Sequence, residues 1–396
     1  MKILFAHDNK FCRGEDGLYY SDGFFPYRLW QRYLDVFDEV VVAGRVRSLR
    51  PGEDIEKLDL SSGPGVSFVE IPSIHSPLAK FFARRQAVEQ IRLALSQCDA
   101  LIVRVVSEIG PLAVEVAIEM NKPWAVEVVG CTFDSLWNYG NWQGKVYAPY
   151  AAYMTRKMIK KAPYALYVTT EFLQRRYPCS GVVVACSDVQ LVNRSPQAFS
   201  QRLARIEQGN RPFKIGLIGS LVHANKGVDT ALEAFGAIKD RLPSFQFCIL
   251  GGGNPEKWEK IAKENGVADQ TLFCGTLPNG NAVSAWLDDI DLYIQPSFQE
   301  GLPRALVEAM SRGCPAIGST AGGIPELLDV ECLHKPGDSR ALASLLEQAI
   351  HDKCWQQKQS ERNFQEAAQY EKTILDQRRQ AFWRGFINYC KQEIPK

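Results

Sequence analysis

Short apolar runs alternate with longer amphipathic segments along the first half of the chain. The runs hold about five to seven residues and are rich in β-branched side chains, as buried strands are, and the segments between them have the apolar spacing of helices. This alternation predicts a doubly wound parallel sheet. The predicted strands are Lys2–Ala6, Glu39–Ala43, Ser67–Ile71, Ala100–Val106, Trp124–Val129 and Ala165–Thr169, and the predicted helices are Pro26–Phe37, Leu78–Ser96, Pro111–Asn121 and Tyr147–Ala162.

A second alternating set follows a polar, weakly helical segment at residues 193–211. We therefore predict a first α/β domain over residues 1–205, a second over residues 206–375, and a C-terminal helix over residues 376–396. A chain of 396 residues is long enough for two domains that each bury a core. The predicted strands of the second domain are Phe213–Gly219, Phe245–Leu250, Thr271–Cys274, Leu292–Gln295, Pro315–Ile317 and Cys332–His334.

The segment from Glu300 to Glu308 is the most informative in the chain. It predicts a loop after the strand Leu292–Gln295 and a helix that opens near Pro303 and ends at Gly313, because proline fits a first helical turn and glycine ends a helix. Ligands bind at the carboxyl edge of an open α/β sheet, and free amides at a helix start suit phosphate. Two carboxylates there would accept hydrogen bonds from sugar hydroxyl groups. The segment predicts a nucleotide-sugar site, and the alternative is a capped helix with a solvated acid.

The residues around this segment resemble the donor-binding signature of the retaining glycosyltransferases of family 4. The resemblance rests on Glu-Gly-Leu-Pro from Glu300, Glu-Ala-Met from Glu308, Gly-Cys-Pro-Ala-Ile from Gly313 and Gly-Gly-Ile-Pro-Glu from Gly322. It extends over the C-terminal half and more weakly over the N-terminal half. It implies the GT-B fold, in which two Rossmann-like domains face each other across a cleft. The first domain would bind the acceptor, and the second the nucleotide sugar.

The resemblance implies roles for residues of the second domain. Glu308 would accept hydrogen bonds from the ribose, and Glu300 would lie beside the donor sugar, near the amides of Gly301 and Leu302. Lys226, near a predicted helix start, would meet the diphosphate, where positive charge and free amides stabilise the leaving group. The alternative for Lys226 is that it is a surface lysine in a loop, without a function.

The resemblance also implies further donor-binding positions, and at one of them this chain departs from the family. Gly275 and Leu277 match the strand and loop that cover the base, and Gly23 matches a glycine turn near the diphosphate. The family usually has arginine where this chain has Ser220, which leaves the site one cation short. Arg304 is our candidate for the missing charge, and the alternative is that it points to solvent.

Candidates for contact with the acceptor lie in the first domain. Many family members have a histidine at the end of the fifth strand, and this chain has none there. Glu127 in that strand would be costly to bury unpaired. It is predicted to form an ion pair with Arg104, and the alternative is that it polarises an acceptor. Asp134, in the following loop, is predicted to contact the acceptor and to act in catalysis.

A long polar and aromatic loop is predicted at residues 8–27, after the first strand. Loops of that length inside compact domains are often functional or mobile. Tyr19, Tyr20, Phe24 and Tyr27 could stack on sugar rings or simply anchor the loop. His7, at the end of the strand, is interpreted as a hydrogen-bonded structural residue.

The C-terminal residues 341–392 are helical in pattern. Four aromatic residues lie there at helical spacing, namely Phe382, Trp383, Phe386 and Tyr389. The face that they form would lie on a membrane or pack against the first domain, and we favour packing because the final helix of GT-B proteins crosses back. Two basic and apolar stretches, residues 81–85 and 155–161, are interpreted as solvated helix faces, with contact to anionic lipid as the alternative.

Charge and composition narrow the classes of partner and cofactor. The net charge of +1, from 46 basic and 45 acidic residues, argues against nucleic acid as a partner. Asp289 and Asp291 have the Asp-x-Asp form of metal-dependent enzymes, but they precede their strand and are interpreted as its cap, so no metal or other cofactor is expected. The eleven scattered cysteines indicate free thiols in a reducing cytoplasm. The start of the chain is interpreted as a strand and not as a signal peptide.

The sequence thus predicts a cytoplasmic, metal-independent retaining glycosyltransferase, and the alternative above adds peripheral contact with a membrane. It would move a sugar from a nucleoside diphosphate to a hydroxyl group of a saccharide or lipid-linked acceptor. One alternative is a catalytically silent protein of the same fold that binds a sugar nucleotide or a polysaccharide. A nicotinamide dehydrogenase is a weaker alternative, because no Gly-x-Gly-x-x-Gly follows the first strand.

Overall fold

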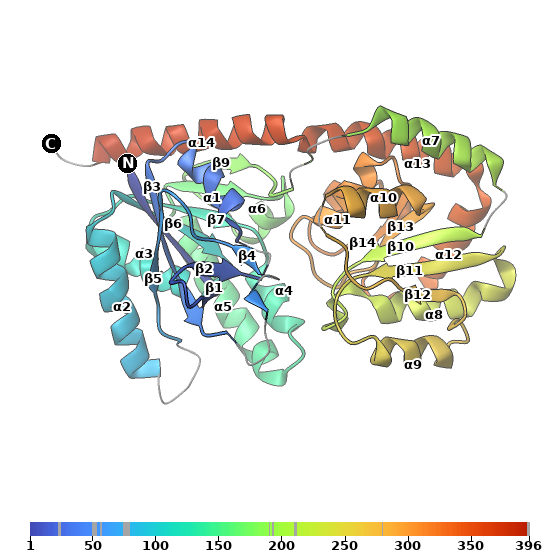
Figure 1. Ribbon diagram of the computed structural model, residues 1–396, viewed down its shortest axis with the longest axis horizontal. Helices are drawn as coiled ribbons and strands as arrows, with labels where there is room; N and C mark the ends of the chain where they lie inside the picture. Colours follow the sequence, from blue (N-terminus) through green and yellow to red (C-terminus); the bar gives the residue numbers. More distant parts are fainter. Residues whose placement is uncertain are drawn as a thin grey trace. The chain divides into compact units, whose positions relative to one another are not determined.

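The computed structural model describes residues 1–22, 25–49, 54–55, 58–73, 80–189, 191, 194–209, 212–278 and 280–393, with side chains left out of the description at residues 80–82. The chain divides into two compact units (Figure 1). The first unit comprises Met1–Phe133, Tyr147–Cys186 and Asp376–Lys396, and the second comprises Asp134–Val146 and Ser187–Leu375. Each unit is built on a sheet of mainly parallel strands joined by helices, so the prediction of two Rossmann-like α/β units is confirmed.

The first unit contains nine strands among the described residues. Seven of them run parallel in the order β5-β3-β1-β6-β7-β8-β9, with the apolar core strands β1 and β6 near the middle. The strands are β1 (Lys2–Arg13), β2 (Tyr19–Ser21), β3 (Glu39–Arg47), β4 (Asp59–Leu60), β5 (Val66–Glu70), β6 (Ala100–Val105), β7 (Trp124–Val128), β8 (Tyr164–Tyr167) and β9 (Val182–Ala185).

Strand β1 extends well beyond the end predicted for it at Ala6, so the prediction of a long loop at residues 8–27 is wrong over much of its length. The register of β1 on β3 shifts between Ala6 and Lys10 and then resumes with Lys10 opposite Arg45. The antiparallel strands β2 and β4 continue the sheet from this extension. Buried Phe11 and Cys12 hold the extension in place, and the polar residues before them hide it from a search for apolar runs.

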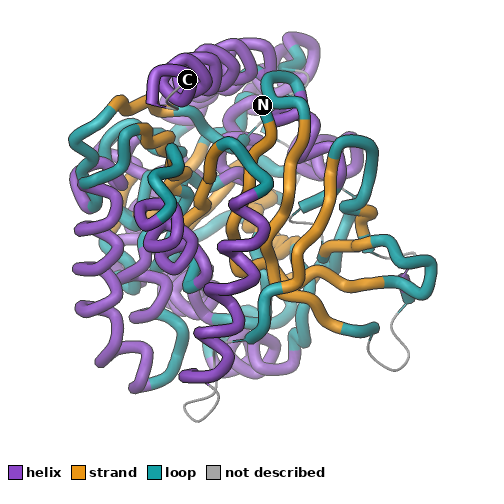
Figure 2. Tube along the Cα trace, turned by 90° about the vertical axis from the view of Figure 1, so that its left-hand side faces the viewer, coloured by secondary structure: helices purple, strands orange, loops and turns teal. Residues whose placement is uncertain are grey.

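Helices flank the first sheet (Figures 1 and 2). The final helix belongs to this unit from Asp376 onward. Trp383 on it is fully buried, with its ring 6.1 Å from that of Tyr33 and 5.9 Å from that of Phe37. The helices with most of their residues in this unit are α1 (Tyr27–Leu34), α2 (Lys80–Ser96), α3 (Ile109–Glu119), α5 (Trp142–Lys160), α6 (Phe172–Arg176) and α14 (Lys372–Glu393), whereas α4 (Thr132–Trp137) lies mostly in the segment assigned to the second unit.

The second unit has a six-stranded parallel sheet in its described part, in the order β12-β11-β10-β13-β14-β15. Strands β11 and β13 have the bounds that the sequence predicted, because each is a continuous apolar run of a length typical of buried parallel strands. The strands are β10 (Phe213–Ile218), β11 (Phe245–Leu250), β12 (Thr271–Phe273), β13 (Leu292–Gln295), β14 (Ala316–Ser319) and β15 (Leu333–His334).

Helix α7 belongs to the second unit, whose longer piece of chain runs from Ser187 to Leu375, whereas the sequence analysis expected that domain to begin after residue 205. The buried guanidinium of Arg202 on α7 explains this attachment. It donates to the carbonyl oxygens of Arg312 and Leu287 at 3.1 and 2.8 Å, and also to that of Ile290. The main helices of this unit are α7 (Pro196–Gln208), α8 (Val228–Ile238), α9 (Glu256–Glu264), α10 (Asn281–Asp289), α11 (Arg304–Ser311), α12 (Ser339–His351) and α13 (Lys353–Glu366).

The predicted helical tail is divided into separate helices. Asp338 begins α12 and Asp352 begins α13, because each carboxylate accepts a hydrogen bond from a backbone amide of the following turn at 2.9 Å. All eleven cysteines are free thiols. Within the described part of the chain, no helix has both the length and the apolarity needed to cross a membrane.

Candidate functional site

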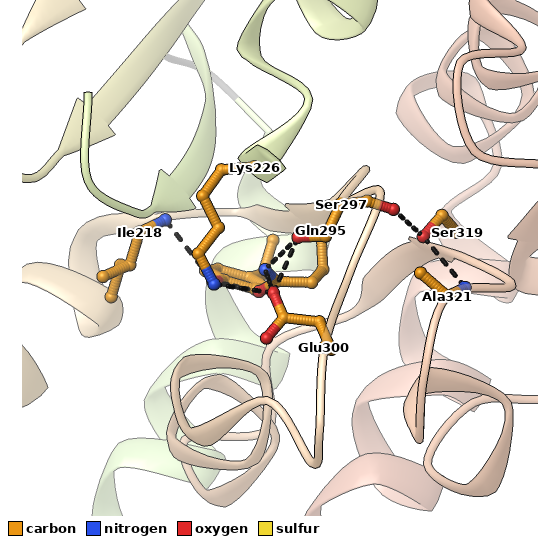
Figure 3. Close-up of polar contacts among 8 residues, drawn as sticks. Ile218, Lys226, Gln295, Ser297, Glu300, Ser319 and Ala321 are labelled. Atoms are coloured by element: carbon orange, nitrogen blue, oxygen red, sulfur yellow. Dashed lines mark hydrogen bonds and ion pairs between the residues drawn. The ribbon is translucent and has the colours of Figure 1, made fainter. Parts of the chain in front are cut away.

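The candidate site lies at the carboxyl edge of the second sheet, in the loops that follow β10, β13 and β14 (Figure 3). Parallel neighbouring strands end at the same edge, so residues far apart in sequence meet there. The first loop leads to Lys226 in a short 3-10 helix just before α8, the second carries Glu300 into α11, and the third begins at Ser319. As predicted, α11 begins directly after Pro303.

One carboxylate oxygen of Glu300 accepts three hydrogen bonds (Figure 3). Oε1 receives Lys226 Nζ at 2.7 Å, Ser297 Oγ at 2.7 Å and Gln295 Nε2 at 2.9 Å. No described residue donates to the other oxygen, Oε2. The side chain is only 9% exposed, so these three donors fix its orientation and leave Oε2 as its remaining acceptor.

A second layer of hydrogen bonds orients the donors. The hydroxyl group of Tyr293 donates to Gln295 Oε1 at 2.8 Å, which turns the amide nitrogen of Gln295 toward Glu300. Ser319 Oγ donates to the carbonyl oxygen of Ser297 at 2.5 Å and ties the loop to β14. Burial raises the pKa of Tyr293, so its hydroxyl group stays protonated as a donor. The sequence analysis missed Gln295 and Ser297, although two polar residues at the end of an apolar strand were a usable signal.

Glycines allow the loops to approach one another closely. Gly227 has a φ of 70°, and a Cβ atom there would lie 2.0 Å from the carbonyl oxygen of Pro296. A Cβ atom on Gly322 would lie 2.2 Å from the carbonyl oxygen of Glu300. The amide of Gly323 donates to the carbonyl oxygen of Gly301 at 2.7 Å. Backbone contact between these loops therefore depends on residues without side chains.

Helix α11 places Arg304 and Glu308 one turn apart. Burial raises the pKa of the Glu308 carboxyl group, and the charge of Arg304 partly opposes this effect. No described residue donates a hydrogen bond to the Glu308 carboxylate. A partly buried acid that the protein leaves without donors is an acceptor prepared for a ligand or for water.

The start of α11 also carries free backbone donors. No described residue accepts a hydrogen bond from the amides of Gly301 or Leu302, which come just before the helix. Arg304, its first residue, is exposed and forms no ion pair with any described residue. Free amides and a cation at a helix N-terminus form a local positive field that suits an anion.

Three further predicted donor positions lie on the loops after β10 and β12. Ser220 Oγ accepts from the amide of Val222 at 3.3 Å and closes its own turn. Gly275 has a φ of 68°, and its carbonyl oxygen accepts from the amide of Gly251 at 2.7 Å. Leu277, two residues further on, is 37% exposed. Ser220 supplies no positive charge, so the cation deficit predicted at this position remains.

Two predictions for the first unit are tested by contacts there. The ion pair of Glu127 with Arg104 is confirmed at 3.1 Å, and Tyr33 donates to the other carboxylate oxygen at 2.8 Å. His7 Nδ1 accepts from the amide of Asn9 at 2.9 Å, and burial lowers the His7 pKa to about 3. His7 is therefore a neutral acceptor in the structure, which agrees with its structural interpretation.

Of the predicted site residues Asp134 and Gly23, the structure describes Asp134 alone. Asp134 lies in the first turn of α4, at the start of a segment that contacts assign to the second unit. One turn later, the side chain of Asn138 donates to the carbonyl oxygen of Phe298 at 3.5 Å. Gly23 and Phe24 lie outside the described residues.

The Asp289 and Asp291 pair caps the amino edge of the second sheet, as predicted. Asp291 Oδ2 accepts from the amide of Lys214 at 2.9 Å, and the ammonium of Lys214 pairs with Asp289 at 2.5 Å. Among the described residues, no group of three or more His, Cys, Asp or Glu side chains is arranged to hold a metal ion.

Sequence comparison connects this geometry to known proteins. Residues 212–352 match the family model described as "Glycosyl transferases group 1". Protein CapJ of Staphylococcus aureus is 33% identical over 392 residues, which cover 99% of this chain and 96% of CapJ. The amylovoran biosynthesis glycosyltransferase AmsK of Erwinia amylovora is 32% identical over 161 residues, or 38% of this chain and 39% of AmsK.

Solved structures share the whole fold at low sequence identity. Sucrose-phosphate synthase from Thermosynechococcus elongatus has a TM-score of 0.70 at 15% identity and covers 98% of this chain and 100% of its own. HepE of Anabaena, in complex with UDP-glucose, has a TM-score of 0.65 at 16% identity, with 97% and 100% coverage. The fold is that of the GT-B glycosyltransferases, and the chain belongs to the glycosyl transferases of group 1.

Proposed function

We propose that this glycosyltransferase moves a sugar from a nucleoside diphosphate to a hydroxyl group of a saccharide or lipid-linked acceptor, with retention of anomeric configuration and without a metal ion or other cofactor. The arrangement of Glu300 is the observation that carries the proposal. Its Oε1 is occupied by three protein donors, while Oε2 of this mostly buried side chain has none among the described residues. A hydroxyl group of the donor sugar would supply the missing hydrogen bond.

The diphosphate of the donor would lie between Lys226 and the start of α11. Lys226 Nζ keeps donor capacity beyond its bond to Glu300, because an ammonium has three protons. The amides of Gly301 and Leu302 and the guanidinium of Arg304 would add to the positive field. Arg304 would replace the arginine that related enzymes carry where this chain has Ser220.

Positive groups at this position would act mainly on the departure of the nucleoside diphosphate. Negative charge builds on the phosphate oxygen as the glycosidic bond breaks, and fixed donors stabilise it more in the transition state than in the ground state. The departing oxygen would take the proton of the acceptor hydroxyl group on the same face of the sugar, while the acceptor oxygen forms the new bond. Asp134 is our candidate for contact with the acceptor.

The nucleoside part of the donor would be held further along the same edge. The Glu308 carboxylate would accept hydrogen bonds from the ribose hydroxyl groups, and Gly275 and Leu277 would lie against the base, with Gly23 near the diphosphate. The exposed Leu277 side chain offers apolar surface to a planar ring. A UDP sugar is a reasonable first donor to test, since HepE has been solved with UDP-glucose.

The biological role that we propose is polysaccharide biosynthesis at the cytoplasmic side of the cell. AmsK, a partial relative, carries amylovoran biosynthesis in its name. Transfer to a saccharide acceptor agrees with such a role.

Two glutamate variants test the site. Glu300→Gln and Glu308→Gln should each lower transfer by about a hundredfold or more, as removal of one group that stabilises a transition state does. The assay would follow release of nucleoside diphosphate from UDP, GDP and ADP sugars, with and without saccharide acceptors. Glu264→Gln, at the exposed end of α9, is the matched control and should keep most of its activity. Full activity in both site variants would reject the proposal.

The same assay separates catalysis from silent binding. A protein that only binds sugar nucleotides would be stabilised thermally by a donor without releasing nucleoside diphosphate. The observation that favours this second function is Ser220, which supplies no positive charge where related enzymes carry arginine.

A further inference from the structure

Helix α5 presents tyrosines and lysines to solvent in the part that belongs to the first unit. Its buried side is a narrow line of Ala148, Thr155 and Ile159, and Thr155 Oγ1 bonds to Thr132 Oγ1 at 3.2 Å. The opposite side carries large exposed apolar residues. These are Tyr147, Tyr150, Tyr153 and Met154, which are 48%, 58%, 62% and 39% exposed.

These side chains form a continuous surface with the lysines that follow. Positions at intervals of three and four residues lie on one side of a helix. Tyr147, Tyr150, Met154 and Lys157 have these intervals within α5, and Lys161 continues them just beyond its end. We call Tyr147, Tyr150, Tyr153, Met154, Lys157, Lys160 and Lys161 the tyrosine–lysine face. Single exposed apolar residues are ordinary, but a contiguous group bordered by polar residues indicates a binding surface.

The positive charge of this segment is not balanced by acidic residues of the same segment. Residues 135–170 contain five basic residues and no acidic residue, although the whole chain has a net charge of only +1. Lys157, Lys160 and Lys161 form no ion pair with any residue that the structure describes. The face therefore combines apolar rings with free positive charge.

Helix α2, which holds the other basic stretch of this unit, shows the opposite arrangement. Arg84 pairs with Glu115 at 2.8 Å, and Arg85 pairs with Glu89 at 3.3 Å. Arg84 and Arg85 are thus neutralised by carboxylates of the protein itself. Their interpretation as a solvated helix face agrees with these pairs.

We propose that the tyrosine–lysine face docks on a membrane surface that contains anionic phospholipids. Tyrosine rings are suited to the headgroup region, because one end is apolar and the hydroxyl end stays hydrated. Lysines beside them are attracted by the lipid charge, and a helix of this kind lies in the plane of the interface. Two copies of the face would repel each other through their lysines, which makes a second copy of the chain a poor occupant. This inference does not depend on the donor site.

Flotation of the full chain with vesicles tests the docking. Wild-type protein should float with vesicles of phosphatidylcholine and phosphatidylglycerol and remain unbound with phosphatidylcholine alone. Lys157→Gln, Lys160→Gln and Lys161→Gln combined should weaken binding about a hundredfold, since each lysine near an anionic surface contributes about fivefold, the equivalent of about 1 kcal/mol. Tyr147→Ser, Tyr150→Ser and Tyr153→Ser combined should also weaken binding strongly.

Matched controls come from α2. Arg84→Gln with Arg85→Gln removes nearly as much charge, and Leu93→Ser removes an apolar residue that is 66% exposed, yet both should bind like wild type. Nucleoside diphosphate release without vesicles should be unchanged in every variant, which separates failure of docking from failure of the donor site. Wild type that ignores anionic vesicles, a lysine variant that binds fully, or a dimer that the tyrosine variant splits would each overturn the proposal.

Discussion

At the scale of single residues, the two glutamates of the site are held in different ways. Glu300 is fixed by three donors on one oxygen, whereas Glu308 has a raised pKa and no donor among the described residues. A carboxylate that the protein itself does not stabilise destabilises the fold at neutral pH. Such a residue indicates selection for a ligand at the expense of stability.

Glu308→Gln should raise the free energy of unfolding at neutral pH. It should also weaken donor binding about tenfold to a hundredfold, because a hydrogen bond to a charged group is lost. The folded pKa lies above the unfolded value, so below the ordinary value of 4.5 both states are protonated and the two proteins should be equally stable. As the pH rises through that value, Glu308 ionises in the unfolded wild type at a lower pH than in the folded wild type. This ionisation favours the unfolded state, so the stability advantage of the variant should grow. Denaturant unfolding at several pH values would measure this trend, and a gain confined to acid pH would contradict it.

At the scale of helices, strands and loops, apolar runs were a good guide to buried strands and a poor guide to edges. β11 and β13 have their predicted bounds because both of their faces are covered and almost every residue is apolar. The extension of β1 and its hairpin with β2 were missed, since polar residues line the exposed part of the sheet. The site followed the same rule: Glu300 and Lys226 were found by motif, whereas the roles of Gln295 and Ser297 depend on side-chain directions that no pattern contains.

The turn at Gly227 should be sensitive to any side chain. Gly227→Ala would combine a left-handed φ of 70° with a Cβ atom 2.0 Å from the carbonyl oxygen of Pro296. Gly17→Ala is the matched control, because its φ is 76° and nothing lies within 4 Å of the new atom. The control should cost about 1–2 kcal/mol, the penalty of the left-handed conformation alone. The site variant should cost more and also lower donor binding through Lys226, as thermal unfolding and donor titration would show; equal costs would contradict the close contact.

Arg202 should be needed to attach α7 to the second unit. Arg202→Met would keep the bulk of the side chain but remove the guanidinium donor from three carbonyl oxygens. Those of Leu287 and Ile290 keep a second, longer contact, so the main cost is the unpaired carbonyl oxygen of Arg312, at about 1–3 kcal/mol. Proteolysis within residues 196–208 should become much faster. Arg205→Met, one turn later on a partly exposed side chain, is the control and should change little. Slow proteolysis of both variants would mean that other contacts hold the helix.

At the scale of the whole molecule, the first unit is assembled from three separate pieces of chain. Its last piece, the end of α14, fills the space against Tyr33 and Phe37 with the buried ring of Trp383. The sequence predicted this packing from the apolar spacing of the tail and from the resemblance to GT-B proteins. The pattern alone could not exclude a membrane-facing helix, because spacing does not identify what covers a face.

Trp383→Ala should destabilise the first unit by about 3–5 kcal/mol, as removal of a large buried aromatic ring does. Trp383→Phe should cost much less, because the indole N–H that it removes has no hydrogen-bond partner. Hydrogen exchange should become faster in β1 and β6 and stay unchanged in β10 and β13. A uniform increase across both sheets would show that the two units do not unfold separately.

The discontinuous first unit has a consequence for synthesis of the protein. Residues 1–186 leave the ribosome well before the helix that completes the core of the first unit, because residues 187–375 are translated in between. At about 5–20 residues per second, the nascent unit waits on the order of 10–40 seconds with the surface around Tyr33 and Phe37 uncovered. During that interval it is a natural client for chaperones, and a ribosome that stalls just before residue 376 would release a polypeptide whose second unit can fold and whose first unit cannot.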